Sequence, residues 1–280
     1  MKKSLIVINT SKDESMLLAN EINQFLCKKG YKSDFLNFDG FCENIAFEGY
    51  NFVITLGGDG TVLFAARNAV KLGIPVFPVN LGQFGFIASV QPFEWKNELE
   101  TFLDGDAFIE KRAMLDVKVV RDSQIVYSSL GLNDVVISAK RGATTVSLSV
   151  NYDGLPLCKL KSDGVIVSTS TGSTAYSAAA GGPIVDPHLS AFVLTPVNSF
   201  SLSSRPIVLS PDGDLEIIVE QSRAKEICIT VDGQDAEILK SEDRIFVSKY
   251  EKKVQLVCAT REKFYNALRS KLNWSGGPHA

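Results

Sequence analysis

A glycine-rich turn that contains an acid is the first feature of this sequence that could do chemistry. The run FVITLG, which begins at Phe52, has the apolar and β-branched composition of a buried strand, and it continues directly into Gly57-Gly58-Asp59-Gly60-Thr61. The residues that follow, TVLFAARNAVKLG, space their apolar side chains as a helix does. Free backbone N–H groups at such a strand-to-helix turn bind phosphate, and glycines let the phosphate come close.

Asp59 needs a separate explanation, because a carboxylate in an anion-binding turn repels phosphate. We predict that Asp59 accepts a hydrogen bond and finally a proton from a substrate hydroxyl, or that it contacts a metal ion indirectly. The alternative is that Asp59 caps the following helix, since Asp is favoured at N-caps. The turn lacks the Gly-Lys-Ser/Thr of a P-loop, and no Gly-x-Gly-x-x-Gly follows the first predicted strand, which weakens both commoner nucleotide-binding motifs.

A second run of glycine and small hydroxyl residues lies in KSDGVIVSTSTGSTAYSAAAGGPIV, which spans residues 161–185. A predicted strand, DGVIVST, ends in Thr171-Gly172-Ser173-Thr174 ahead of a short helix, so backbone and hydroxyl donors surround another concave turn. Tyr176 could offer its ring to a nucleotide base. Its spacing alone favours a position in the core or at an interface.

The elements that position these turns change character part-way along the chain. Up to about Asp104, short β-rich runs alternate with amphipathic helical segments, which is typical of a parallel sheet with crossover helices. Later, Val- and Ile-rich strands follow closely on one another, and one short helix is inserted at residues 171–180. Predicted N-terminal strands begin at Leu5, Ser33, Phe52 and Ile74, with a helix at 14–28, and predicted turns in the second half lie at Asp122-Ser123, Asp153-Gly154 and Asp232-Gly233.

This pattern predicts a Rossmann-like α/β N-terminal domain followed by an all-β C-terminal domain. We place the α/β domain at residues 1–105 and the β-rich domain at 106–260. Residues 261–280 are predicted to form a C-terminal helix, from about Glu262 to Leu272, and a tail that packs on either domain.

The composition narrows the class of protein. With 280 residues, 45% hydrophobic content and a net charge of −3, the chain can bury two cores and lacks the basic excess expected for nucleic-acid or anionic-membrane binding. The first apolar run stops at Ile8, so we expect no signal peptide, and no stretch approaches the roughly 20 apolar residues of a membrane span. We interpret the scattered cysteines as reduced core residues of a cytoplasmic protein: Cys27, Cys42, Cys158, Cys228 and Cys258.

Both turns resemble those of a known family. GGDGT after a strand is similar to the signature shared by NAD kinases, diacylglycerol kinases, sphingosine kinases and, more distantly, phosphofructokinases. The segment from Lys161 to Val185 is similar almost throughout to the NAD kinase signature and not to the lipid kinases. The chain therefore resembles the NAD kinase family from about Gly57 to Gln234. This resemblance implies transfer of the γ-phosphate of ATP, or of a phosphate of polyphosphate, to the adenosine-ribose 2′-hydroxyl of NAD.

The same resemblance implies roles for individual residues. Asp59 is the catalytic acceptor, the backbone amides of Gly57, Gly58 and Gly60 face the ATP phosphates, and Thr61 completes that nucleotide-binding turn. The residues that match NAD contacts of the family are Phe86, Asn133, Asp134, Lys161, Asp163, Thr174, Ala175, Tyr176, Ser177, Ala178, Ala179 and Gln234.

Several of these positions have ordinary structural alternatives. Asn133-Asp134 is a common turn or cap dipeptide. Lys161 fits equally well as a solvated strand lysine, and Phe86 and Gln234 as packing or turn residues. The chain also departs from the family, because Ser170 stands where a Pro is usual and Phe64 stands where some members have a basic residue or His.

The implied cofactors and partners follow from the chemistry. A divalent cation, most simply Mg²⁺, travels with ATP, because the sequence shows no dense set of metal ligands and its two histidines, His188 and His279, are far apart. The resemblance implies a homodimer or homotetramer that binds NAD and ATP or polyphosphate, without nucleic acid or membrane. The rival functions are a lipid kinase and a dinucleotide sensor that transfers nothing.

We expect the acids Asp134 and Asp163, together with Asn133, to lie in one pocket with Asp59. Carboxylates gathered in a shielded site repel one another, so at least one should have a pKa above the usual value of about 4. The gathering would suit a substrate with several ribose hydroxyls, since ionised carboxylates only accept hydrogen bonds. The alternative is that Asp134 and Asp163 are strand-edge acids that face water.

Replacing Tyr176 with Ala tests the role of its ring. We expect NAD binding to weaken by about 1–3 kcal/mol, by analogy with the stacking of bases on aromatic side chains. Isothermal titration calorimetry with NAD measures the loss, and thermal unfolding serves as the control. Unchanged NAD affinity with a large drop in the melting temperature would identify Tyr176 as a core residue.

Overall fold

The computed structural model describes residues 2–40, 47–82, 85–140, 144–222, 224, 226–234 and 236–272. The chain divides into two compact units. The first unit joins Met1–Arg112 to Lys252–Ala280, and the second unit is Ala113–Glu251.

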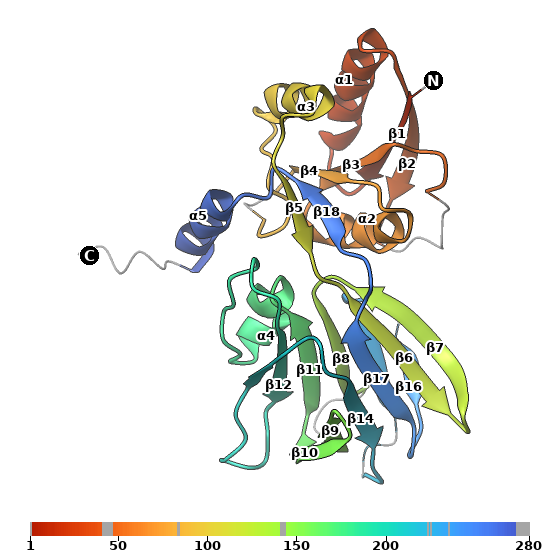
Figure 1. Cartoon of the computed structure of the whole chain (residues 1–280), viewed down its shortest axis with the longest axis vertical. Helices are drawn as coiled ribbons and strands as arrows, with labels where there is room; N and C mark the ends of the chain where they lie inside the picture. Colours follow the sequence, from red (N-terminus) through yellow and green to blue (C-terminus); the bar gives the residue numbers. More distant parts are fainter. Residues whose placement is uncertain are drawn as a thin grey trace, which may run out of the picture. The chain divides into compact units, whose positions relative to one another are not determined.

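The first unit is built on a six-stranded sheet in the order β2-β1-β3-β4-β18-β5. Strands β2, β1, β3, β4 and β18 are parallel, and β5 is antiparallel to β18. Figure 1 shows α1 and α3 together on one face of this sheet and α2 on the other. The elements are β1 (Lys2–Asn9), α1 (Ser15–Lys28), β2 (Tyr31–Phe38), β3 (Phe52–Gly57), α2 (Asp59–Leu72), β4 (Val76–Asn80), α3 (Trp95–Asp104), β5 (Ile109–Arg112), β18 (Val254–Val257) and α5 (Arg261–Leu272).

The predicted α/β pattern is confirmed in this unit, and its physical basis is visible in the burial. Strand β3 is buried along its whole length, as expected for a central strand covered by helices on both faces. Helix α1 presents Leu18, Ile22 and Leu26 to the core at helical spacing. Helix α2 ends at Gly73, which has a left-handed φ of 69° that favours glycine.

The predicted domain limits differ from the observed division. The first unit extends to Arg112 instead of ending at residue 105, because β5 is paired with β18. The chain returns to the first unit at Lys252 instead of leaving the β-rich unit at 260, because β18 adds to the N-terminal sheet beside β4. Local patterns could not predict this return, since it depends on pairing between strands far apart in the sequence. Helix α5 belongs to the first unit.

The second unit is a sandwich of two six-stranded sheets. One sheet has the order β10-β9-β14-β17-β6-β7 and the other β13-β12-β11-β8-β15-β16, and all pairs are antiparallel. The strands of the first sheet are β6 (Leu115–Arg121), β7 (Gln124–Gly131), β9 (Val146–Tyr152), β10 (Leu155–Ser162), β14 (Leu215–Val219) and β17 (Arg244–Lys249). Those of the second are β8 (Asp134–Ala139), β11 (Gly164–Thr169), β12 (Phe192–Val197), β13 (Ile207–Leu209), β15 (Ile227–Val231) and β16 (Glu237–Leu239).

The core of the sandwich lies between its sheets, where Val117, Leu148 and Ile217 from one sheet pack with Ile137 and Val167 from the other. The three predicted turns have residues of positive φ, at Asp122-Ser123, Asp153-Gly154 and Asp232-Gly233. The predicted helix at 171–180 forms as two short pieces, a 3₁₀ turn η1 (Gly172–Thr174) and helix α4 (Tyr176–Ala179).

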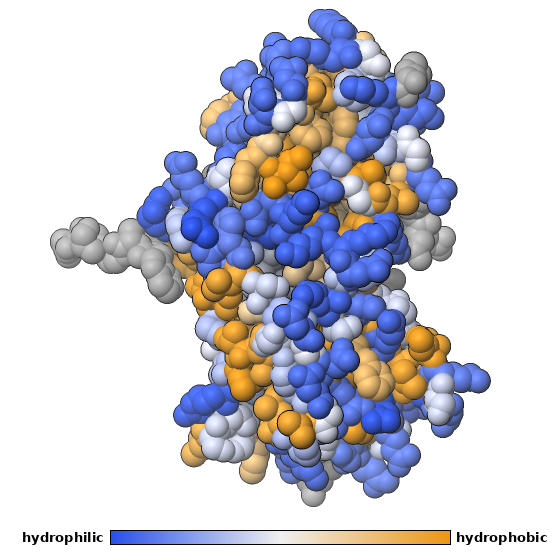
Figure 2. Space-filling view, viewed as in Figure 1, coloured by the Kyte–Doolittle hydropathy of each residue, from blue (hydrophilic) through white to orange (hydrophobic). Residues whose placement is uncertain are grey.

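The cysteines only partly follow the prediction. Cys228 and Cys258 are buried, Cys158 is half-buried, and all described cysteines are free thiols. Cys27 is exposed on α1, so its assignment to the core was wrong, and Cys42 lies outside the described residues. None of the described helices combines the length and apolar character needed to span a membrane. On the face shown in Figure 2, hydrophilic residues predominate on the surface and hydrophobic residues form smaller patches.

Candidate functional site

The glycine-rich turn lies at the carboxyl end of β3, where β1 and β4 also end. Gly57 has no room for a side chain, because a Cβ there would lie 2.3 Å from the Thr61 hydroxyl oxygen. The Thr61 side chain is buried, and its hydroxyl accepts a hydrogen bond of 3.4 Å from the Asn9 amide. The Gly57 carbonyl accepts from the Leu81 backbone at 2.8 Å. The Thr61 side chain therefore supports the turn from inside, and the backbone is the part of the turn that can meet a ligand.

Asp59 holds a neighbouring loop by its carboxylate. Its Oδ2 accepts a hydrogen bond from the backbone N–H of Phe86 at 3.0 Å, and its Oδ1 accepts from Ile87 at 3.1 Å and Ala88 at 3.0 Å. We call this arrangement the Asp59 clamp. The capping alternative is wrong, since Gly58 is the N-cap residue of α2 and no side chain caps it.

The clamp requires a glycine beside it. A Cβ at Gly85 would lie 2.2 Å from Asp59 Oδ1, so any side chain there would displace the carboxylate. The ring of Phe86 faces α5, with its centroid 6.2 Å from that of Phe264 and 4.8 Å from the ammonium of Lys271. Phe86 is thus tied at its backbone to Asp59 and at its ring to α5, all within the first unit.

In the second unit, Asp232 holds the Asn133-Asp134 pair in the same manner. Its Oδ2 accepts from the backbone N–H of Leu132 at 2.9 Å, and its Oδ1 accepts from Asn133 at 2.8 Å and Asp134 at 3.1 Å. The Asp232 N–H donates in return to the Asp134 carbonyl at 2.9 Å. We call this the Asp232 clamp. It was missed at the sequence level, where Asp232 was assigned only to a turn.

The Asn133-Asp134 pair also packs against residues 170–179, which contain the sequence GSTAYS and which we call the GSTAYS segment. A Cβ at Gly172 would lie 2.0 Å from the Asn133 carbonyl oxygen, so only glycine allows this approach. The Thr169 hydroxyl donates to the Leu132 carbonyl at 2.6 Å, and the Thr169 N–H donates to the Asn133 carbonyl at 2.9 Å. Two motifs that lie well apart in the sequence therefore form one structure at the adjoining ends of β8 and β11.

This structure contains polar groups that the protein itself does not satisfy. Among the described residues, the buried Asn133 Oδ1 and Ser168 Oγ have no hydrogen-bond partner. Asp134, opposite Ser168 across the β8–β11 pair, is only 6% exposed. Burial, with the charge of Asp232 adding to it, raises the pKa of Asp134 to about 7. Unsatisfied buried groups are rare, and two at the adjoining ends of β8 and β11 indicate a place where a polar ligand completes the bonding.

The side chains of the GSTAYS segment divide between surface and interior. Tyr176 is 48% exposed, so of the two positions favoured by its spacing the core position was wrong and the interface position stays a prediction. Ser177 is fully buried and its hydroxyl bonds that of Thr195 at 2.9 Å, which removes it from the ligand-facing side chains. Ser170, which replaces the usual Pro, donates to the Leu189 carbonyl at 2.6 Å. Thr174, Ala175 and Ala178 are half-buried and Ala179 is exposed, so their backbone and side-chain surfaces remain accessible.

The structure does not bring Asp163 to Asp134 within one chain. The Asp163 carbonyl accepts from Ala139, which stands at the far end of β8 from Asp134, about 16 Å along the strand. The expectation of a shared pocket for these two acids is therefore wrong for a single chain. The Asp163 carboxylate accepts from Asn198 at 3.0 Å. Nearby, the exposed Lys161 places its ammonium 5.5 Å from the centre of the Phe200 ring.

Gln234 and Phe64 lie in different units of the chain. Gln234 is half-buried and its N–H donates to the Val231 carbonyl at 3.0 Å, closing the turn that carries Asp232. Phe64 is buried and stacks on Phe38 with ring centroids 4.8 Å apart, so it belongs to the core. His279 lies outside the described residues.

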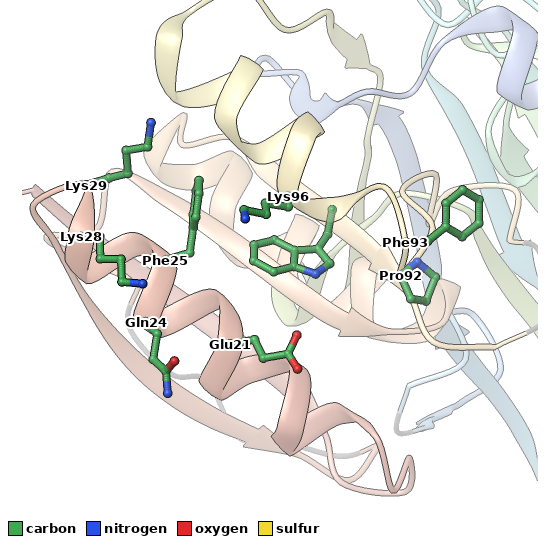
Figure 3. Close-up of a pocket in the computed structure, with 9 residues that line it drawn as sticks. Glu21, Gln24, Phe25, Lys28, Lys29, Pro92, Phe93 and Lys96 are labelled. Atoms are coloured by element: carbon green, nitrogen blue, oxygen red, sulfur yellow. The ribbon is translucent and has the colours of Figure 1, made fainter.

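The described residues contain no group of three or more His, Cys, Asp and Glu side chains that could hold a metal ion. A groove of about 680 Å³ in the first unit lies between α1 and α3 and contains none of the predicted site residues (Figure 3). It is lined by Glu21, Gln24, Phe25, Lys28, Lys29, Pro92, Phe93, Trp95 and Lys96.

Comparison with known proteins agrees with the two motifs. The model for the ATP-NAD kinase N-terminal domain matches residues 37–107, and the model for the ATP-NAD kinase C-terminal domain matches residues 132–259. A protein of Treponema denticola named NAD kinase is 45% identical over 277 residues, which cover 99% of this chain and 98% of that protein. This chain belongs to the NAD kinase family. An NAD kinase of Treponema pallidum (strain Nichols) is 42% identical over 275 residues, covering 98% of this chain and 90% of the relative.

Solved structures of an NADH kinase and an NAD kinase share the fold. Yeast NADH kinase complexed with NADH aligns with a TM-score of 0.86 at 21% identity, covering 99% of this chain and 89% of that one. An NAD kinase from Archaeoglobus fulgidus in complex with ATP aligns with a TM-score of 0.76 at 24% identity, covering 98% and 100%. The two-part architecture of the NAD kinase family is therefore the architecture of this chain.

Replacing Asp59 with Asn tests the Asp59 clamp and the proposed acceptor together. An Asn places an NH₂ group where a carboxylate oxygen accepts backbone N–H groups, so the 86–88 loop loses at least one bond. We expect turnover to fall by about 10²–10⁴-fold, the usual contribution of a general base. Steady-state assays against Asp106→Asn, an exposed aspartate of the same unit, measure this. Turnover of Asp59→Asn equal to that of the control would refute both roles.

Replacing Asp134 with Asn tests its buried charge. Because the folded-state pKa is about 7 and the unfolded value is near 4, the carboxyl stabilises the fold below pH 4 and loses that contribution as pH rises through 7. We expect the variant to gain stability over the wild type at pH 8, by at most about 4 kcal/mol, and much less at pH 5. Urea unfolding at the two pH values measures the difference. An equal effect at both would show that Asp134 ionises normally.

Proposed function

We propose that this protein is an NAD kinase that transfers the γ-phosphate of ATP to the 2′-hydroxyl of the adenosine ribose of NAD and so forms NADP. The observation that carries the proposal is the interlocked pair of motifs in the second unit, where Gly172 packs on Asn133 and leaves polar groups unsatisfied. Membership of the NAD kinase family over the whole chain supports it.

Asp59 is the acceptor in the proposed reaction. An ionised carboxylate has about four lone-pair sites, and the backbone amides of the clamp use three of them. The remaining site, on Oδ2, can accept the ribose hydroxyl. The hydroxyl oxygen then bonds to the γ-phosphorus, the bond from that phosphorus to the β,γ-bridging oxygen breaks, and the hydroxyl proton passes to Asp59 and on to solvent. No covalent enzyme intermediate forms.

The glycine-rich turn supplies the site for the ATP phosphates. Gly58 is extended at the start of α2, and Gly60 has open space where a side chain would be, so the backbone is accessible to an anion. The amides at the start of a helix and its dipole favour negative charge. The divalent cation enters with ATP, as part of that substrate, and neutralises phosphate charge during transfer.

The second unit supplies the site for NAD. Asn133 and Asp134 offer an amide and a carboxylate to ribose hydroxyls, and the exposed Tyr176 ring offers a surface for an aromatic base. The same segment offers NAD the accessible surfaces of Thr174, Ala175, Ala178 and Ala179. The buried Ser177 supports the segment through its bond to Thr195. Four further residues are proposed to contact the dinucleotide because they match NAD contacts of the family: Phe86, Lys161, Asp163 and Gln234.

The proposal includes a cytoplasmic location and a homodimer or homotetramer. Free thiols at all described cysteines support a reducing compartment. Light scattering on the purified protein measures the assembly, and a monomer with full activity would contradict that part of the proposal. Polyphosphate is the alternative phosphate donor.

One assay separates the proposed function from its rivals. The chain is incubated with NAD, ATP and Mg²⁺, and NADP is measured by an NADP-specific dehydrogenase, with parallel reactions that contain diacylglycerol or sphingosine. We expect NADP to form only when ATP and NAD are both present. Phosphorylated lipid without NADP would identify a lipid kinase, and NAD binding without any product would identify a sensor.

A further inference from the structure

We infer that Asp232 is a positioning residue for the kinase reaction, which holds the backbone of Asn133 and Asp134 in the conformation that receives NAD. This inference rests on the proposed function. Asp232 is 7% exposed and bonds three consecutive backbone N–H groups, those of residues 132–134. Asp232 therefore acts on NAD through the two residues that it holds.

The geometry repeats that of the Asp59 clamp in an unrelated part of the chain. In both, Oδ2 accepts the first of three consecutive N–H groups and Oδ1 accepts the second and third. Hydrogen bonds to a charged acceptor are stronger than neutral ones. At residues 86–88 and 132–134 the strands leave the backbone N–H groups without a strand partner, and three bonds to one carboxylate fix each of these segments. Residues 86–88 and residues 132–134, which both include proposed contacts of NAD, are thus each held by one carboxylate.

The surroundings of the Asp232 clamp leave no room for adjustment. A Cβ at Gly131 would lie 2.8 Å from Val231 and 3.4 Å from Asp232 Oδ1. On the opposite side, Gly172 packs on Asn133 as described above. The backbone of 131–134 is therefore confined between the turn of Asp232 and the GSTAYS segment, and a small displacement of either would move the Asn133 and Asp134 side chains.

Asp243 is a buried carboxylate of the same unit that has only a structural role. It is 1% exposed, and its oxygens accept from the Arg121 guanidinium at 2.8 and 2.7 Å and from the Lys240 N–H at 2.7 Å. These partners include none of the proposed site residues. Asp243 therefore provides a matched control for the loss of a buried carboxylate.

The charge of Asp232 has a second consequence. Asp134 is buried against β11, where it faces Ser168, and near β15, which leads into Asp232. Among the described residues, Asp232 is the charged group that acts on Asp134, and its repulsion adds to burial in raising the pKa of Asp134. Removing the charge of Asp232 should lower that pKa, and the pH dependence of kcat/KM for NAD should follow it because Asp134 is a proposed contact of NAD.

The test compares Asp232→Asn, Asp232→Glu and Asp243→Asn with the wild type. For each protein, the melting temperature, the KM for NAD and for ATP, and the pH dependence of kcat/KM for NAD are measured. We expect Asp232→Asn to raise the KM for NAD about tenfold or more, because buried N–H groups lose their acceptor, and to leave the KM for ATP unchanged. The fall of kcat/KM for NAD on the acid side of the pH profile, which we call the acid limb, should move to lower pH in Asp232→Asn.

The other variants separate position from charge and from stability. Asp232→Glu keeps the charge but displaces it, so we expect the KM for NAD to rise without a move of the acid limb to lower pH. Asp243→Asn should lower only the melting temperature. The inference is overturned if the Asp232 variants lower the melting temperature as Asp243→Asn does while the KM for NAD and the acid limb stay at wild-type values. Should Asp232→Asn fail to fold, Asp232→Glu decides by its KM for NAD.

Calorimetric binding of NAD distinguishes this inference from the function on which it rests. A wild type that forms no NADP contradicts the proposed kinase activity. If that wild type binds NAD, weaker binding by Asp232→Glu still supports the positioning role, and equal binding overturns it. If it forms NADP and Asp232→Glu matches it in KM for NAD, only the positioning role fails.

Discussion

A carboxylate that accepts three consecutive backbone N–H groups is the interaction on which the candidate site depends. It occurs at Asp59, which holds residues 86–88, and at Asp232, which holds residues 132–134. A buried N–H group without an acceptor costs about 1–3 kcal/mol, so losing either carboxylate would leave a costly set of donors. Both segments lie at or beyond the ends of strand ladders, and the carboxylates take the place of the missing strand partners.

Glycines next to the held segments allow the close packing that the two motifs need. Gly85 lets Asp59 approach its loop, and Gly172 lets the GSTAYS segment rest on the Asn133 backbone. A side chain at Gly85 would collide with the Asp59 carboxylate, and a side chain at Gly172 would collide with the Asn133 carbonyl. Phosphoryl transfer needs little covalent chemistry from the protein and gains its rate from positioning and charge neutralisation, so rigid backbone at both motifs suits the proposed reaction.

The sequence predicted the parts of the molecule that local patterns determine. Apolar and β-branched composition located β3, apolar periodicity located α2, and Asp-Gly dipeptides located turns of positive φ. It could not predict that β18 returns to the first sheet, because that pairing joins residues far apart in the chain. It also failed at Asp163, since only the register of β8 and β11 shows that Asp163 and Asp134 lie at opposite ends of the pair. Asp232 was overlooked because Asp is common in Asp-Gly turns, so the turn alone accounted for an aspartate at this position.

Native-state amide hydrogen exchange tests the clamps most directly. We expect the amides of residues 86–88 and 132–134 to exchange slowly, with opening free energies near those of the strands in their own units, although they lie at turns, loops and strand ends. Slow exchange should be lost at 132–134 in Asp232→Glu and retained at 86–88. Exchange of these amides in the wild type as fast as that of exposed loop residues would contradict the claim that the carboxylates hold them.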